Sequence, residues 1–482
     1  MISKNTGIRL IAGIIIGVIT CLGILILTQT GPLGNCTAVL PPVAIGPTGI
    51  GSDMESFPEF SSGEQAQKFR TSHTDTGNHA DNRGAGVHPV PAAGEINVSA
   101  ERQVIEADNR FAFDLYAKLR HDQNLTGRNL FFSPYSISTA FALTYEGARS
   151  VTADEIRTAF HLPADDQTRR EGFAGLSADL NRGSTIRTAN ALWANANYSF
   201  LPEYTGTAKK YYAADTRNLD FGKDPEGSRA VINGWVENQT EGKIQELLPV
   251  RSLDPLTALV ITNAVYFKGS WEKEFNKAKT GNSSFWVSRD RDIDVPMMYL
   301  WDKDALYQYG ETGGVRILKL PYSNSSGKKL SMLVLLPESE SLDPAENLIT
   351  EWGLTQVRGS LEPRKVEISF PKFSIDATYN LPKTLSAMGM PAAFSSAADL
   401  SGMDGTHLLY VDKAIHKAHI EVNEEGTEAA AASVVVVRQK GGPSSPDTPL
   451  SFRADHPFVF LIQDDDTDNI LFIGRVVNPA EG

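Results

Sequence analysis

The segment that most constrains this chain is residues 424–437, because its two halves favour different secondary structures. Residues 424–432 are rich in Glu and Ala and favour a helix, whereas residues 434–437 are consecutive valines, which favour a strand. Residues 438–449 are rich in Gly, Pro and Ser, which neither a helix nor a sheet accommodates in its interior. One interpretation is an exposed helix that runs into an edge strand. The other is an extended segment that can enter a sheet and that leads into an exposed loop.

The distribution of side-chain sizes supports the second interpretation. Alternate residues of a strand share a face, so one face of this segment would carry only small side chains: Thr427, Ala429, Ala431 and Ser433. Small side chains can pass between two strands of a buried sheet without clashing with the layer beneath. Glu428 would lie on the opposite face, where its charge stays in solvent if that face is open to water.

This run resembles the reactive-loop hinge of the serpins, specifically of their inhibitory members. The hinge residues are Glu424, Glu425, Gly426, Thr427, Glu428, Ala429, Ala430, Ala431 and Ala432. The resemblance implies a suicide-substrate inhibitor of serine proteases, whose loop is cleaved by the target and whose hinge then inserts into the main sheet. It also implies an α+β, serpin-like fold with helices packed around three β-sheets and an exposed reactive loop. Roughly a dozen new backbone hydrogen bonds, at about 1 kcal/mol each, would favour insertion by as much as a whole domain's stability.

The resemblance also implies which bond the protease would cleave. Counting from Glu424 as in that family, the reactive bond lies between Lys440 and Gly441. A lysine there suits the acidic specificity pocket of a trypsin-like serine protease. Arg438 is an alternative reactive residue, although cleavage there would shorten the insertable strand, and the loop after Lys440 is longer than the family leads us to expect. The alternative is that these are only solvated loop charges.

Four more residues resemble serpin positions that control opening of the main sheet: Ser133, Asn263, Trp271 and His416. Ser133 precedes Pro134 and starts a predicted helix, which could also be an ordinary core helix. Asn263 interrupts the apolar run 258–271, which predicts a strand buried on both faces. A buried Asn and a lone strand His are more often structural than functional. The resemblance implies that these residues control the opening of the main sheet and take no part in catalysis.

The N-terminal part of the chain predicts attachment to a membrane. From Leu10 to Leu27 there is no charge, and Lys4 and Arg9 precede this stretch, so residues 1–28 form a signal anchor or a cleaved signal peptide. Lipidation at Cys36 is a third alternative. Residues 29–97 predict a flexible, low-complexity tether, and residues 98–482 a serpin-like domain. We expect an extracytoplasmic protein that is membrane-anchored or secreted.

The secondary-structure pattern is helical in the first third of the domain and rich in strands after it. Ser99 is a predicted helix cap, and Thr152 and Glu155 form a predicted capping box. A helix is expected over 230–248. Strands are expected over 185–193, 258–271, 317–322, 330–336, 366–373 and 414–422, a short helix over 382–388, and a hairpin from 456–462 and 470–479.

Composition excludes several other functions. Both cysteines, Cys21 and Cys36, precede the domain, so neither a disulfide framework nor a Cys-based zinc site can hold it together. A net charge of −13 argues against nucleic-acid binding. No nucleophile elbow, zincin or phosphate-loop motif is present, so we expect no enzyme, catalytic residue, metal or cofactor, and a monomer. The main alternative is a non-inhibitory serpin-fold binding or surface protein, and a hydrolase is a weaker one.

Overall fold

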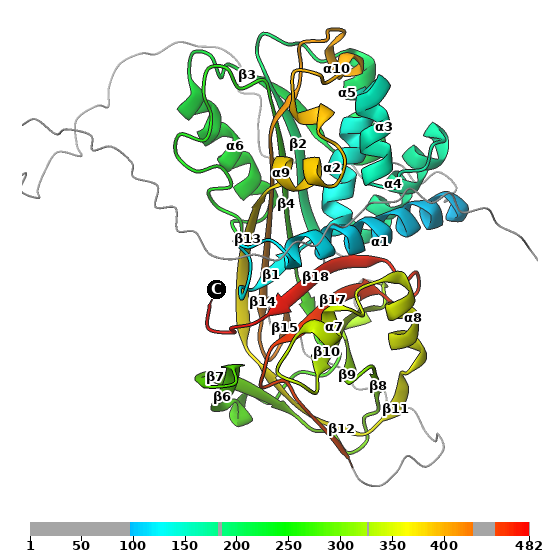
Figure 1. Ribbon diagram of the computed structural model, residues 1–482, viewed down its shortest axis with the longest axis vertical. Helices are drawn as coiled ribbons and strands as arrows, with labels where there is room; N and C mark the ends of the chain where they lie inside the picture. Colours follow the sequence, from blue (N-terminus) through cyan, green and yellow to red (C-terminus); the bar gives the residue numbers. More distant parts are fainter. Residues whose placement is uncertain (1–96, 182–185, 325–326, 428–448, 482) are drawn as a thin grey trace, which may run out of the picture. The chain divides into compact units, whose positions relative to one another are not determined.

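The computed structural model describes four stretches of the chain, all within one compact unit: residues 97–181, 186–324, 327–427 and 449–481. The predicted anchor, residues 1–28, lies outside them, as does the predicted tether up to residue 96, so both stay predictions. Among the helices in these four stretches, none is both long and apolar enough to cross a membrane. The described residues form an α+β fold in which helices pack around three sheets, as predicted (Figure 1).

The first sheet contains the strands on either side of the predicted insertion site. In order across the sheet its strands are β3 (Asp215–Leu219), β2 (Ile186–Asn195), β4 (Leu259–Phe267), β14 (Val411–Val422), β15 (Gly426–Thr427) and β5 (Gly269–Ser270). A further strand, β13 (Phe373–Asn380), pairs with β14. Every residue of β4 is buried, as its apolar run predicts.

Both faces of this sheet are covered by helices. On one face α2 (Pro134–Gly147) contacts β2 and β4. The other face packs against α6 (Pro225–Gln239), where Trp193 of β2 and Val260 of β4 join Trp235 in a separate hydrophobic cluster. In Figure 1, α2 and α6 lie on opposite sides of β2 and β4. A residue of β4 therefore faces either α2 or α6, according to the alternation of the strand.

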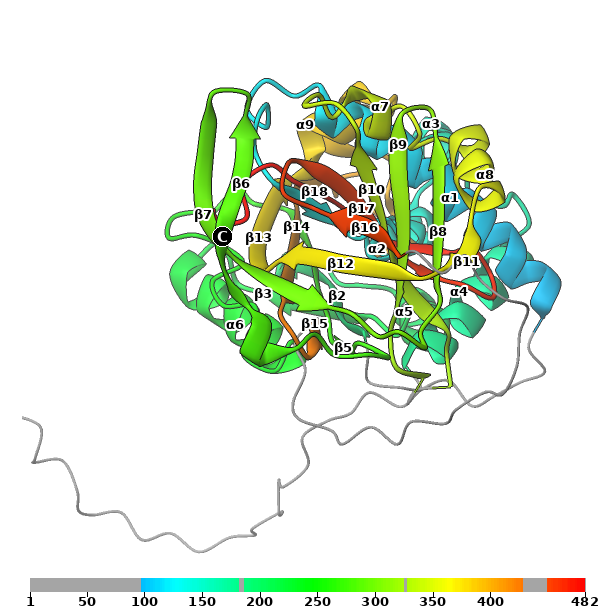
Figure 2. The same cartoon turned by 90° about the horizontal axis from the view of Figure 1, so that it is seen from below.

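The other two sheets complete the framework. The second has the order β1 (Leu130–Phe132), β18 (Ile470–Val476), β17 (Phe458–Asp464), β10 (Leu330–Pro337), β9 (Val315–Pro321), β8 (Tyr307–Thr312) and β11 (Glu362–Arg364). The third, visible in Figure 2, has the order β16 (Leu450–Arg453), β12 (Val366–Pro371), β7 (Arg291–Leu300) and β6 (Gly281–Ser288). The predicted C-terminal hairpin is confirmed, because β17 and β18 pair in antiparallel fashion.

Several of the remaining helices contact α2 or the second sheet, whereas α9 (Leu381–Ala387) and the 3₁₀ turn η3 (Ala392–Phe394) contact β14 and the 3₁₀ turn η1 (Lys277–Lys279) contacts β7. Helix α1 (Val98–Arg120) contacts α2, α4 and β18. The others are α3 (Ser150–Ala159), α4 (Asp166–Asn181), α5 (Pro202–Tyr212), α7 (Asp343–Glu346), α8 (Glu351–Gly359) and α10 (Ser401–Asp404).

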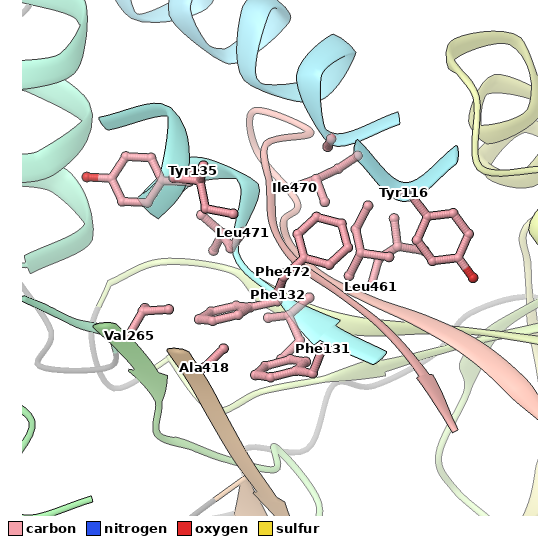
Figure 3. Packing of buried hydrophobic residues seen from close by; sticks show 14 of the residues in the cluster. Tyr116, Phe131, Phe132, Tyr135, Val265, Ala418, Leu461, Ile470, Leu471 and Phe472 are labelled. Atoms are coloured by element: carbon pink, nitrogen blue, oxygen red, sulfur yellow. The ribbon is translucent and has the colours of Figure 1, made fainter. Parts of the chain in front are cut away.

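The main core lies where α1, α2 and the first two sheets meet. Phe131 and Phe132 of β1 lie in this core with Phe472 of β18, and the rings of Phe131 and Phe472 stack at 5.0 Å (Figure 3). Val265 of β4 and Ala418 of β14 are in the same cluster. The apolar core therefore reaches the underside of the first sheet, beneath the two strands of interest.

Three predictions about local structure are wrong, the first two because another hydrogen bond prevails. Helix α1 is capped by Asn97, whose Oδ1 accepts from the Ala100 N–H at 3.2 Å, and not by Ser99. Thr152 and Glu155 do not form a capping box: their side chains accept hydrogen bonds from the Asp399 and Ala392 N–H groups at 2.9 and 2.8 Å. The predicted strand 366–373 is two strands, β12 and β13, in different sheets.

The helix predicted over 230–248 is also shifted. Helix α6 begins at Pro225, where the Asp224 side chain accepts from the Gly227 N–H at 2.8 Å, and it ends at Gln239. Thr240 and Glu241 follow, and Glu241 adopts a positive φ of 53° that a helix cannot contain. The apolar residues after this point belong to a turn region packed on α6 and not to the helix.

Candidate functional site

The candidate site is the seam between β4 and β14, by which we mean the paired residues 259–266 and 411–419. The two strands run parallel, from Leu259 opposite Val411 to Tyr266 opposite His419, with one irregularity near Lys413. Parallel neighbours are joined by long connections and not by a hairpin, so two such strands can separate without breaking a tight turn.

Two residues of the predicted hinge lie at one end of the seam. Gly426 and Thr427 form β15, which pairs with Val422 of β14 on one side and with β5 on the other. In both pairings β15 is antiparallel. The side chain of Asn423 fixes the turn before it, because its Oδ1 accepts from the N–H groups of Glu425 and Gly426 at 3.0 and 3.2 Å.

Thr427 points into the core. Its side chain is fully buried, and its hydroxyl lies 2.9 Å from the Tyr322 hydroxyl. The ring of Tyr322 stacks on Trp271 with centroids 4.6 Å apart. This agrees with the predicted small-residue face, since Thr427 belongs to that face and is directed inward.

Gly426 is the residue that allows this close approach. A Cβ at this position would lie 2.2 Å from the carbonyl oxygen of Gly269, and the φ of Gly426 is +154°. Other residues rarely adopt that backbone conformation, and none would fit the space. Contact with β5 therefore requires a glycine at position 426.

Two lysines hold the acidic residues before β15. Lys372 donates to Glu424 at 2.8 Å, and Lys277 pairs with Glu425. Burial acts to raise the pKa of Glu424, but several hydrogen bonds, the largest effect coming from Lys372, together hold it below its ordinary value. The Glu424 carboxylate thus stays ionised beside Lys372, and both lysine–glutamate pairs tie the turn to neighbouring segments.

Trp271 supports the same turn from the side. Its indole N–H donates to the Asn423 carbonyl at 3.0 Å, and its backbone N–H donates to the Glu425 carbonyl at 2.9 Å. Trp271 is almost fully buried. The structure therefore brings Trp271 against residues 423–427, although its control role stays a prediction.

A buried polar cluster lies under the middle of the seam. Asn263 of β4 and His416 of β14 are register partners, and Nδ1 of His416 hydrogen-bonds Oδ1 of Asn263. The Ser133 N–H donates to Nε2 of His416 at 3.2 Å. Since Nε2 accepts, His416 is the neutral tautomer with its proton on Nδ1. Complete burial lowers the pKa of His416 to about 3, so it remains neutral at ordinary pH.

Two members of this cluster were missed by the sequence prediction. Nδ2 of Asn263 donates to the Ser136 carbonyl and hydroxyl at 2.9 and 2.6 Å and also contacts Oδ1 of Asn190. Ser136 is one helical turn beyond Ser133, and the Ser133 hydroxyl caps that turn at 3.2 Å from the Ser136 N–H. Asn190 could have been found in the same way as Asn263, because it too is a polar residue within a predicted strand.

Several predicted site residues cannot be placed. Glu428, Ala429, Ala430, Ala431, Ala432, Arg438, Lys440 and Gly441 lie outside the described residues. The structure thus brings together Ser133, Asn263 and His416 under the seam, and Trp271 with residues 424–427 at its end. Lys277, Lys372, Asn423 and Tyr322 also contact this end and were not predicted.

Comparison with known proteins gives a consistent family. The family model described as "Serpin (serine protease inhibitor)" matches residues 106–479. An uncharacterised serpin-like protein of Thermococcus kodakarensis is 40% identical over 386 residues, covering 79% of this chain and 87% of that protein. Human leukocyte elastase inhibitor is 39% identical over 391 residues, covering 78% of this chain and all of that protein.

Solved structures agree with the sequence relatives. Uncleaved ovalbumin superposes with a TM-score of 0.69 at 33% identity, covering 78% of this chain and 100% of that one. Human thyroxine-binding globulin has a TM-score of 0.69 at 30% identity, covering 79% and 100%.

Proposed function

Because this chain belongs to the serpin family, we propose that it inhibits a serine protease by loop cleavage and hinge insertion. The protease would cleave within residues 428–448, and the hinge would then pair into the seam between β4 and β14. The observation that carries this proposal is the position of β15. Gly426 and Thr427, which belong to the predicted hinge, lie at one end of the seam between β14 and β5, as a strand antiparallel to both.

The register of β15 supports continued insertion. Extending the pairing of Thr427 with Val422 along β14 would place residue 430 opposite His419. Extending the pairing of Thr427 with Gly269 past β5 would place the same residue opposite Tyr266. His419 and Tyr266 face each other in the closed seam. The two ladders therefore agree, and a hinge strand could enter between them without a register shift.

The same register gives each inserted residue a neighbour. Val437 would reach Leu259, where β4 begins, so residues 428–437 would span the whole seam. Ser433 would lie opposite both Asn263 and His416, where its hydroxyl can replace the hydrogen bond that those two residues lose. Ala429 and Ala431 would face the core beside Thr427.

Insertion would be driven by backbone pairing. One parallel ladder, between β4 and β14, would be replaced by two antiparallel ladders, and antiparallel pairing is somewhat stronger per residue. At about 1 kcal/mol per net hydrogen bond, roughly a dozen new bonds provide an energy comparable to the stability of a domain. The uncleaved protein would then be a kinetically held state.

For specificity we propose a trypsin-like target and a reactive bond between Lys440 and Gly441. The register adds one point to the sequence argument. Cleavage after Arg438 would still leave residues 428–437 to span the seam, so shortening of the strand does not exclude Arg438 as the reactive residue. Both residues are cations that suit an acidic specificity pocket.

We also propose that the domain acts outside the cytoplasm, as a membrane-anchored or secreted protein. The support is the uncharged stretch Leu10–Leu27 after two basic residues, followed by a chain rich in Gly, Pro and Ser up to the domain. Such a tether would give the reactive loop reach from a membrane surface.

The test is incubation of the purified protein with trypsin, followed by denaturing electrophoresis and mass analysis of the released peptide. A denaturation-resistant complex with a peptide that begins at Gly441 is the expected result. A peptide that begins at Gln439 would assign the reactive bond to Arg438. Lys440→Ala and Arg438→Ala variants provide the matched comparison. Clean cleavage without a complex would favour the non-inhibitory alternative.

A further inference from the structure

Asp108 lies on the buried side of α1, at a position where the helix packs against its neighbours. It comes one helical turn after Val104 and three residues before Phe111, and all three residues are fully buried. Neither carboxyl oxygen of Asp108 has a hydrogen-bond partner among the residues that the structure describes. Buried carboxylates are normally paired with a cation or bound by several N–H groups, so this site is unusual.

The elements around α1 offer Asp108 few polar groups. Helix α2 presents Ser138, whose hydroxyl is also buried without a hydrogen-bond partner in the described part of the chain. The same helix presents Tyr135, a buried phenol near enough to interact electrostatically with Asp108. Helix α4 presents Ser177, which hydrogen-bonds that phenol. Hydroxyl groups are thus the polar neighbours of Asp108 on these two helices.

The charged groups on the surrounding elements have other partners or point elsewhere. Glu101, two turns earlier on α1, is directed toward α4. The turn between β17 and β18 contacts α1 through Asn109, whose Nδ2 donates to the Asp468 carbonyl at 3.0 Å. The Asp468 carboxylate lies 3.2 Å from Nε of Arg358, which belongs to α8. Among the described residues, no cation compensates a charge on Asp108.

Close packing also keeps water away from the carboxyl group. Helices α1 and α4 approach so closely that a Cβ on Gly172 would lie 2.5 Å from the Val104 side chain and 2.6 Å from the Ala100 carbonyl oxygen. Burial raises the pKa of Asp108 well above its ordinary value, and the Ser138 hydroxyl acts weakly in the opposite direction. An ionised carboxylate here would be strongly destabilising, whereas a neutral carboxylic acid has an O–H that can donate to Ser138.

We propose that Asp108 is an uncharged carboxylic acid at neutral pH, that it joins α1 to α2, and that its ionisation in alkali loosens this joint. The joint lies next to the seam, because Ser136, two residues before Ser138 on α2, accepts from Asn263 of β4. Alkali should therefore weaken the support that α2 gives to the seam. Only the consequence for loop insertion rests on the proposed function, because the charge of Asp108 does not depend on it.

The proposal fixes how stability depends on pH. An aspartate in the unfolded chain loses its proton near pH 4, whereas the folded chain keeps the Asp108 proton to a higher pH. Between these two points the folded chain binds one proton more, so stability falls as the pH rises. His416 acts in the opposite sense below pH 6.5, because burial lowers its pKa. A comparison of two proteins that both keep His416 separates the two effects.

The test compares the purified full chain with its Asp108→Asn variant by denaturant titration from pH 5 to pH 9. The unfolding constant of the wild type, divided by that of the variant, should rise about tenfold for each pH unit from pH 5 until the folded carboxyl group ionises. His416 contributes equally to both proteins and cancels. A ratio that stays constant from pH 5 to pH 9 would overturn the proposal.

Glu106→Gln is the matched control. Glu106 is a carboxylate on the same helix, but its side chain is 55% exposed and lies 3.3 Å from Arg102. The unfolding constant of this variant should follow that of the wild type across the pH range. A profile like that of Asp108→Asn would refute the assignment of the effect to the buried carboxyl group.

Infrared spectroscopy covers the case in which Asp108→Asn fails to fold. A protonated carboxyl group absorbs at a different frequency from an ionised carboxylate, so the wild type should show a protonated band at pH 7 that disappears in alkali. Burial also raises the pKa of Asp412, which is why the band is measured in Asp412→Asn as well. Absence of the band at pH 7 in that variant would overturn the proposal. None of these measurements requires a protease, so their failure is separable from a failure of the proposed inhibition.

Discussion

Nδ1 of His416 and Oδ1 of Asn263 are joined by a hydrogen bond across the seam, one residue on β14 and the other on β4. This bond links the two strands that a third strand would have to separate. Both side chains also bind the α2 region: the Ser133 N–H donates to His416, and Asn263 donates to the Ser136 carbonyl. Opening the seam at this point therefore requires an exchange of partners within a buried polar cluster.

The protonation state of His416 predicts a loss of stability in acid. Its pKa in the folded protein is about 3, well below the ordinary 6.5, because burial disfavours the charged form. Below pH 6.5 the unfolded chain binds a proton that the folded chain does not, so stability falls as the pH decreases toward 3. The expected slope is roughly 1.4 kcal/mol per pH unit within this window, measured from denaturant midpoints at pH 7, 6 and 5.

His416→Gln isolates this effect from other titrating groups. The variant cannot take up a proton, so the difference in unfolding free energy between it and the wild type should shrink as the pH falls from 6.5. A constant difference between pH 7 and pH 5 would show that His416 is not the titrating group.

Thr427→Arg should convert an inhibitor into a substrate. Thr427 is fully buried against Tyr322, and an unpaired guanidinium there would cost several kcal/mol. We expect cleavage by trypsin to continue while the yield of covalent complex falls by about a hundredfold or more, as seen by denaturing electrophoresis. Thr427→Ser keeps the hydroxyl and should retain the complex. Wild-type complex formation by the arginine variant would rule out insertion through this end of the seam.

Gly426→Ala should weaken the attachment of β15. The added Cβ would collide with the Gly269 carbonyl at 2.2 Å, and the positive φ is unfavourable for alanine. We expect a loss of about 1–3 kcal/mol in unfolding free energy, measured by denaturant titration. Gly206→Ala, within α5 and with no atom within 4 Å of the new Cβ, should instead stabilise by about 0.5–1 kcal/mol. Equal effects of the two changes would contradict the contact with Gly269.

Trp271→Phe should loosen the turn that precedes β15. Phenylalanine keeps an aromatic ring against Tyr322 but cannot donate to the Asn423 carbonyl, which Trp271 does at 3.0 Å. We expect about 1 kcal/mol of destabilisation and faster hydrogen exchange over residues 423–427. Trp352→Phe is the matched control, because Trp352 is 71% exposed and its change should leave both quantities unaltered.

The sequence by itself determined those features that depend on local pattern. The apolar run of β4, the Ser133–Pro134 start of α2, the closing hairpin and the small-residue face that begins at Thr427 all follow from side-chain periodicity, capping chemistry or size. The fold class was predicted from the family resemblance, because the motifs that resemble the family extend along most of the domain.

Only the tertiary structure decided how those local elements meet. Thr152 and Glu155 have the spacing of a capping box, yet each side chain binds a backbone N–H group that folding brings from more than two hundred residues away. The protonation state of His416 has the same origin. Its Nε2 accepts a hydrogen bond within a fully buried cluster, so the imidazole is neutral. This state cannot be predicted from neighbours in sequence, since hydrogen-bond partners and burial are properties of the assembled fold.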